Sequence, residues 1–245
     1  MTRARQRGRF FASLRRAINR LTGLRGGKDR GKGCLVLEKM TLEQFSQALA
    51  ASSPTPGGGS AAALAGSLSA SLVMMVCDLT IGREKYRAHD ETLSGVRQRA
   101  DLLRRDLLAL VDRDAAAYES VMAARRLPKG NTIEKQARES AIARATLFAT
   151  ETPLATAEGC ASLLDLAVEV ARKGNVNAVS DAGTAAMLAY AGLRAGVMNI
   201  RTNLHGIADP ARQAVIRDRV RRLEVDGERL REEALTAVFG RISPA

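Results

Sequence analysis

DETLSGVRQRADLLRRDLLALVDRDAAAYESVMAA, residues 90–124, sets the architecture of this chain. Its apolar side chains recur at alternating steps of three and four, which places them on one face of an α-helix. A stripe of this length must be covered by other helices, so the segment predicts a long central helix in a bundle. The stripe consists of Leu93, Val96, Ala100, Leu103, Leu107 and Leu110.

Helical patterns also occur on both sides of this segment, separated by turn residues. Pro153 and Pro210 are each expected at a helix start, because the first helical turn tolerates proline. No alternation of period two predicts a strand. We therefore expect an all-α fold, a single domain of six to eight helices. The further helices are expected at 42–51, 61–79, 132–150, 153–173, 181–199 and 210–239.

The composition supports helices and a packed core. Hydrophobic residues make up 46% of the chain, aromatic residues only 3%, and tryptophan is absent. A core made of Ala, Leu, Val and Met favours helices over strands. The apolar run 61–81 is about as long as a membrane span. Because it contains Ser and Thr residues and Asp78, a buried helix of a bundle explains it better than a membrane span does.

The net charge of +12 is concentrated at the N-terminus. Residues 1–33 carry eleven basic residues and one acidic residue, whereas the remaining 212 residues carry 27 basic and 25 acidic ones. A nearly neutral body argues against nucleic-acid binding. We interpret residues 1–39 as a basic extension and residues 40–245 as the domain. The alternative for the extension is an amphipathic membrane-surface helix or a targeting peptide at 10–24.

Cysteine and histidine usage indicates a reduced, metal-free protein. Cys34, Cys77 and Cys160 are scattered and form no C-x-x-C pair, which predicts a cytoplasmic chain. His89 and His205 have no partner at metal-ligand spacing. We therefore expect neither a metal site nor a cofactor.

Asp114 continues the apolar stripe by one further step of four and so faces the inside of the bundle. A carboxyl group in an apolar site has a raised pKa, which suits general acid–base catalysis. The alternative is a structural Asp that is held by a Ser, an Arg or a backbone amide.

A glycine-rich turn precedes the apolar helix at 61–79. Its open N–H groups and the helix dipole could hold an anion or a carbonyl oxygen; the alternative is a simple tight turn. No strand precedes it, so a dinucleotide-binding loop is excluded. The turn consists of Pro56, Gly57, Gly58, Gly59 and Ser60.

Three more polar groups lie in predicted loops or helix ends. Each could bind a ligand, and each could equally be a loop, cap or turn. The first group could bind carboxylates or stack on a ring; it consists of Arg83, Lys85 and Tyr86. The other two groups could bind amide or pteridine edges; they are Asn175, Asn177, Ser180 and Asp181, and the segment 199–204 with Asn203.

Together these motifs resemble the formiminotransferase-cyclodeaminase C-terminal family, which includes stand-alone methenyltetrahydrofolate cyclohydrolases. The resemblance covers residues 40–239 and rests on the segments 53–60, 79–86, 112–118, 127–129, 174–181 and 199–204, in that order. It implies an all-α homodimer, a tetrahydrofolate substrate, no metal, and a catalytic Asp at Asp112 or Asp114. Asp78 departs from the family pattern, in which a neutral residue is expected.

The resemblance favours a methenyltetrahydrofolate cyclohydrolase, because no transferase domain accompanies the chain. The first alternative is a formiminotetrahydrofolate cyclodeaminase, and the second is a non-enzymatic helical scaffold that binds through its basic extension. In either enzyme Asp114 is the expected acid–base group. The glycine turn and the Asn175–Asp181 segment are expected to hold the pterin or the developing oxygen. Arg83 and Lys85 are expected to pair with the folate carboxylates.

Overall fold

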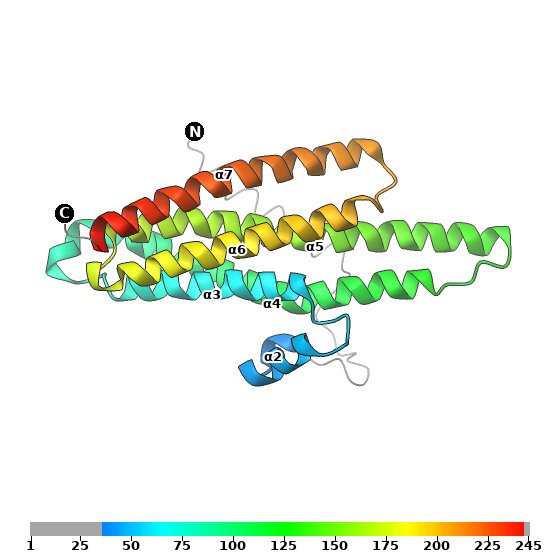
Figure 1. Ribbon diagram of the computed structural model, residues 1–245, viewed down its shortest axis with the longest axis horizontal. Coiled ribbons are helices and arrows are strands. Elements are labelled where there is room, and N and C mark those ends of the chain that lie inside the picture. The colour runs from blue at the N-terminus through cyan, green and yellow to red at the C-terminus, as the bar shows by residue number, and fades with distance from the viewer. Residues whose placement is uncertain (1–35, 243–245) are drawn as a thin grey trace. The chain divides into compact units, whose positions relative to one another are not determined.

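The computed structural model describes residues 36–242, and within that range all regular structure is helical (Figure 1). The six α-helices confirm the predicted fold class and helix number. The extension 1–35, with Cys34 and the predicted helix 10–24, lies outside the described residues. The α-helices are α2 (Leu42–Ala50), α3 (Gly58–Asp78), α4 (Asp90–Arg125), α5 (Thr132–Lys173), α6 (Val179–Leu204) and α7 (Pro210–Ile242). Short 3-10 helices are η1 (Leu37–Lys39), η2 (Glu84–His89) and η3 (Val176–Ala178).

The core lies among α3, α4, α5 and α6, and α7 packs against α5 and α6 (Figure 1). The apolar stripe of α4 faces this core as predicted, and none of its six side chains is more than 8% exposed. Helix α4 is therefore central as predicted, because α3 and α5 cover its long apolar stripe.

Small residues let α3, α5 and α6 approach one another closely. A Cβ added to Gly192 on α6 would lie 2.7 Å from Cys160 Sγ on α5 and 2.9 Å from the Ala62 carbonyl oxygen on α3. Ser69 on α3 donates to the Ala185 carbonyl at 2.8 Å, so α3 and α6 run antiparallel. This close packing explains the Ala-rich, Trp-free composition.

Both described cysteines belong to this core. Cys77 and Cys160 are fully buried and free. Burial raises the pKa of each thiol to about 12, which removes the reactive thiolate at neutral pH. Both thiols are therefore core groups and not nucleophiles.

The predicted break between helices at 150–153 is wrong, because α5 continues through Pro153 as one helix. Proline lacks the N–H that would bond to the carbonyl four residues earlier, that of Ala149. Asn203 Nδ2 on α6 donates to this carbonyl oxygen at 2.7 Å. The helix therefore continues because a side chain from another helix replaces the lost hydrogen bond.

The short helix α2 begins as expected, with a capping box between Thr41 and Gln44. Its buried face is small. Phe45 is buried, but Leu42 is 80% exposed and Leu49 is 39% exposed. The two leucines therefore lie on the surface of the single chain.

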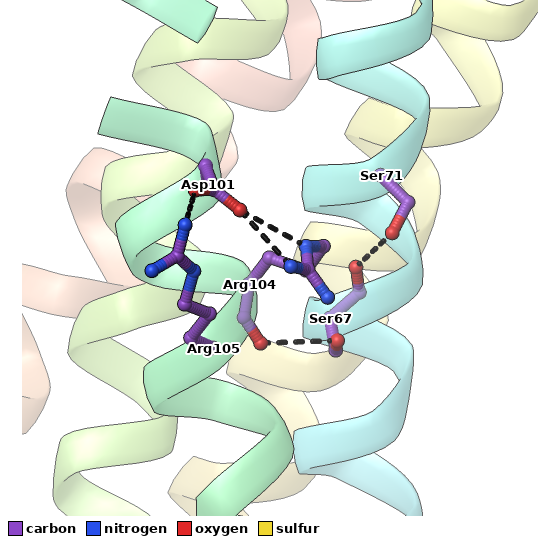
Figure 2. A network of polar contacts seen from close by, with 5 residues as sticks. All are labelled: Ser67, Ser71, Asp101, Arg104 and Arg105. Carbon is purple, nitrogen blue, oxygen red and sulfur yellow. Dashed lines mark hydrogen bonds and ion pairs between the residues drawn. The ribbon is translucent and has the colours of Figure 1, made fainter. Parts of the chain in front are cut away.

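Serines on α3 allow its close contact with α4 (Figure 2). Ser67 donates to the Arg104 carbonyl oxygen at 3.1 Å, and Ser71 donates to the Ser67 carbonyl oxygen at 3.0 Å. Asp101 pairs with Arg104 and Arg105 on the adjoining surface of α4. Such surface pairs add little stability, so the contact depends mainly on the small serine side chains.

One described helix, α3, is long and apolar enough to cross a membrane by length and composition. Eleven of its residues are buried inside the bundle, and it packs against α4, α5 and α6. Its apolar character is explained by this packing, as the sequence predicted.

Candidate active site

Asp114 lies against the first turn of α3, so the structure brings together the inward carboxylate and the glycine turn of residues 56–60. Asp114 Oδ2 is 3.2 Å from Ser60 Oγ. The N-cap residue Gly57 offers no side chain to the free N–H groups of this turn. Asp114 on the neighbouring helix α4 therefore lies beside the free N–H groups at the start of α3.

The glycines of the turn serve different purposes. A Cβ on Gly59 would overlap the Asp114 carboxylate, so close approach requires glycine there. A Cβ on Gly58 would meet nothing within 4 Å, and its backbone is not left-handed. Neither packing nor backbone strain therefore requires glycine at position 58. Its exposed backbone is open to an approaching ligand.

Burial raises the pKa of Asp114 above its usual range, although the Ser60 hydrogen bonds act in the opposite direction. The neutral acid is thus favoured relative to an exposed aspartate. Ser60 is fully buried, and its hydroxyl donates to the Val111 carbonyl at 2.9 Å. The carboxyl group is held rigidly and can exchange a proton with a ligand at the helix terminus.

Asp112, the other acid of the motif, has a different partner. Its Oδ1 accepts a hydrogen bond from the Leu37 amide at 2.6 Å. Leu37 is buried, so this bond fastens η1 to α4. Since Asp112 and Asp114 bond to different elements, only Asp114 adjoins the glycine turn.

At the other end of α3, Tyr86 and Asn175 form a buried cluster with Thr80. The Tyr86 hydroxyl is 3.5 Å from Asn175 Oδ1 and accepts from the Val176 amide at 3.1 Å. The Asn175 amide donates to Thr80 Oγ1 at 2.8 Å, and its Nδ2 donates to the Leu79 carbonyl at 3.1 Å. Tyr86 and Asn175 therefore join α3, η2 and η3, and their polar atoms are paired within the chain.

The other candidates near this Tyr86–Asn175 cluster lie at the surface. Arg83, Lys85, Asn177 and Ser180 are exposed, and Asp181 is half-buried. Helix α6 begins at Val179 without a side-chain cap, so the predicted cap at Ser180 or Asp181 is wrong. The 21 residues of α3 separate this group from Asp114. At about 1.5 Å per residue, the separation is roughly 30 Å.

Asn203 is the last of the predicted site residues. Asn203 bonds to the carbonyl that Pro153 leaves free, which gives it a structural role. Within residues 36–242, no three His, Cys, Asp or Glu side chains are grouped to hold a metal ion.

Arg113 is a feature that sequence reasoning missed. Its guanidinium lies over the Phe148 ring of α5, 4.9 Å from the centroid. Its Nε is buried and has no hydrogen-bond partner. Burial lowers the pKa of Arg113, and only the nearby Glu151 charge opposes this. Its position between two acids was visible in the sequence, but its lack of a partner was not.

Comparisons with known proteins place these observations in context. The model of the family described as formiminotransferase-cyclodeaminase matches residues 41–222. The chain is 45% identical to a methenyltetrahydrofolate cyclohydrolase of Methylorubrum extorquens over 184 residues, which are 75% of this chain and 87% of that one. It is 33% identical to the formimidoyltransferase-cyclodeaminase of Sus scrofa over 73% of this chain but only 33% of that protein. The crystal structure of a formiminotetrahydrofolate cyclodeaminase from Thermotoga maritima shares the fold, with a TM-score of 0.76 at 23% identity, covering 84% of this chain and all of that one.

Proposed function

This chain belongs to the formiminotransferase-cyclodeaminase family, and we propose that it is a methenyltetrahydrofolate cyclohydrolase. The observation that carries the proposal is the sequence match to the cyclohydrolase, which covers most of that protein's length. The match to the animal cyclodeaminase covers only a third of that protein's length. The enzyme would add water to 5,10-methenyltetrahydrofolate and release 10-formyltetrahydrofolate and a proton.

The proposed mechanism needs one proton carrier and one set of N–H donors. Asp114, as carboxylate, takes a proton from the water whose oxygen bonds to the methenyl carbon. The same group then gives a proton to N5 as the bond between that carbon and N5 breaks, and the remaining hydroxyl proton is lost as the formyl group forms. The free N–H groups at the start of α3, among them that of the exposed Gly58, stabilise the developing oxygen.

Cyclodeamination of formiminotetrahydrofolate is the second candidate, and the animal relatives and the Thermotoga structure favour it. There N10 attacks the formimino carbon and ammonia leaves, and Asp114 again carries the proton. Both reactions are proposed to proceed without a metal or other cofactor. We place the enzyme in the cytoplasm, which is consistent with the free thiols of Cys77 and Cys160.

Two assays on the same preparation test the reaction. Methenyltetrahydrofolate is supplied and the decay of its absorbance is followed; formiminotetrahydrofolate is supplied and released ammonia is measured. The spontaneous rate in buffer is subtracted from each. Faster decay in the first assay supports the cyclohydrolase, and ammonia release supports the cyclodeaminase. Activity in neither assay would refute both.

The scaffold alternative is tested by removing residues 1–35, which leaves the Leu37–Asp112 contact intact. An enzyme keeps its activity after this deletion. A scaffold that binds through its basic extension loses salt-sensitive binding to nucleic acid or to acidic vesicles. The proposed enzyme needs neither partner.

We also propose that the enzyme is a homodimer. Neighbouring helices α3 and α6 expose apolar side chains, each at least 38% exposed: Leu68 and Met75 on α3, Leu79 at its C-cap, and Met187 and Met198 on α6. The α3 positions share one helix face. Antiparallel pairing of two such faces would cover them and would bring Arg83, Lys85 and Asn177 of one chain near Asp114 of the other.

Mixed dimers test this pairing. An Asp114→Asn chain and a Lys85→Ala/Asn177→Ala chain are each expected to have low activity alone. If each site uses residues from both chains, co-refolding them restores one intact site in each mixed dimer, up to about a quarter of wild-type activity per chain in a random mixture. A mixture no more active than its separate parts would refute the shared site, and a monomer in light scattering would refute the dimer.

A further inference from the structure

Arg113 carries a positive charge for which residues 36–242 supply no hydrogen-bond or ion-pair partner. Its Nε is buried without a hydrogen bond, and its guanidinium lies over the ring of Phe148. No hydrogen bond or ion pair to its guanidinium occurs within residues 36–242. Burying such a group is unfavourable unless an anion or another acceptor pairs with it.

The acidic group that influences Arg113 does not fill this role. Glu151 on α5 is close enough to influence the charge of Arg113 but forms no ion pair with it. Stacking on Phe148 occupies a face of the planar guanidinium. Its terminal NH2 groups form no hydrogen bond within residues 36–242, and a guanidinium provides a planar fork of donors that matches a carboxylate.

The position of Arg113 relates it to the candidate active site. It precedes Asp114 on α4, and one residue along a helix corresponds to a rise of about 1.5 Å and a turn of roughly 100°. Asp114 therefore faces α3, whereas Arg113 faces Phe148 on α5. Helices α4 and α5 continue past the start of α3 (Figure 1), so both side chains border the same end of that helix.

We infer that Arg113 binds a carboxylate of the substrate, namely one at the glutamate end of the folate. This inference rests on the proposed function, since it assumes that the one-carbon bridge is held at Asp114. Arg83 and Lys85 of the same chain lie at the opposite end of α3 and cannot take this place. A folate ends in at least two carboxylates, so cationic residues of a partner chain can bind another.

The variant Arg113→Met tests the inference because it keeps side-chain length and the contact with Phe148 but removes the charge. The KM for methenyltetrahydrofolate is expected to rise about tenfold or more, as for loss of one charge-assisted hydrogen bond. The kcat should stay within a few-fold of wild type. The melting temperature should be equal or higher, because an unpaired charge is removed from a partly buried site.

The matched control is Arg144→Met on α5, which removes the same charge from an exposed position. It should leave KM unchanged. A second comparison uses the methenyl derivative of tetrahydropteroic acid amide, in which a neutral carboxamide replaces the glutamate and no carboxylate remains. Wild type and Arg113→Met should act on this substrate with equal KM. A tenfold rise for this substrate too would overturn the carboxylate assignment.

Direct binding separates this inference from the proposed reaction. Calorimetric titration with folic acid and with the neutral amide of pteroic acid requires no turnover. Wild type should prefer folic acid, and Arg113→Met should lose that preference. If Arg113→Met only lowers the melting temperature and binds both ligands as wild type does, Arg113 is structural and the inference fails. If the preference depends on Arg113 but neither assay shows turnover, the reaction is wrong and the binding site stands.

Discussion

Polar groups surround both ends of helix α3, but the two ends differ in how many of those groups have a hydrogen-bond partner. At its C-terminal end, Tyr86, Asn175 and Thr80 bond to one another and to nearby backbone groups. At its N-terminal end, Gly58 exposes its backbone and Arg113 on α4 has an unpaired charge. Polar groups that are fully paired hold elements together, whereas unpaired ones at a helix terminus are available to a ligand.

The C-terminal end of α3 is also tied to distant parts of the chain. Arg241, near the end of α7, donates to the carbonyl oxygens of Ala171 and Gly174 at 2.6 Å each. These bonds satisfy carbonyls at the end of α5, where Lys173 and Gly174 stop the helix as predicted. This end of the bundle is therefore a structural joint, and substitutions there should change stability more than chemistry.

The largest expected effect is the loss of turnover in Asp114→Asn. Removing the proton carrier should lower kcat by about a thousandfold, within the range of general acid–base catalysis. Circular dichroism should show an unchanged helical fold. In the control Asp112→Asn, the amide oxygen can still accept from Leu37, so kcat should remain within a few-fold of wild type. Near-normal turnover in Asp114→Asn would remove Asp114 from the mechanism.

The next largest effect separates two adjacent glycines. Gly59→Ala places a Cβ in the Asp114 carboxylate, which must move, and kcat should fall about a hundredfold, as expected for a displaced catalytic group. Gly58→Ala meets no atom, should fold normally, and should gain up to about 0.5–1 kcal/mol from better helix propensity. Its kcat/KM should fall only modestly. Equal kcat values for the two variants would show that the glycine turn does not position Asp114.

A smaller effect is expected in the Tyr86–Asn175 cluster. Tyr86→Phe removes the hydroxyl that accepts from Val176, which should lower the free energy of unfolding by about 1–3 kcal/mol. Urea unfolding measures this loss. Because the hydroxyl is bonded within the chain, kcat of the folded variant should be unchanged. A large fall in kcat with unaltered stability would make Tyr86 part of a ligand site instead.

The smallest effect is a pH dependence. Burial raises the pKa of Asp114 in the folded chain above its unfolded value, so the folded state binds the proton more tightly. The stability that Asp114 contributes is therefore present below the unfolded pKa and is lost as pH rises through the folded pKa. The free energy of unfolding of wild type minus that of Asp114→Asn should fall over this range. A difference that rises with pH would mean that the Ser60 hydrogen bonds outweigh burial.

The placement of Asp114 could be predicted because it follows from the period of one helix. Steps of three and four from Leu93 to Leu110 continue to position 114, whatever the other helices do. The free N–H groups at the glycine turn could be predicted for the same reason, since a helix start exposes N–H groups wherever it occurs. The role of Arg113 could not, because its lack of a partner depends on what α5 offers opposite it.

Local periodicity gave the all-α class, the buried stripe of α4 and the inward carboxylate, because each depends on residues within a few turns of one another. The pairing of polar groups was settled by the folded chain alone. Asn203 bonds to a carbonyl 54 residues away and thereby lets α5 pass through Pro153, and Asn175 bonds to Thr80 across 95 residues. A hydrogen bond requires two atoms within about 3 Å, and no pattern along the chain specifies which distant atoms will meet.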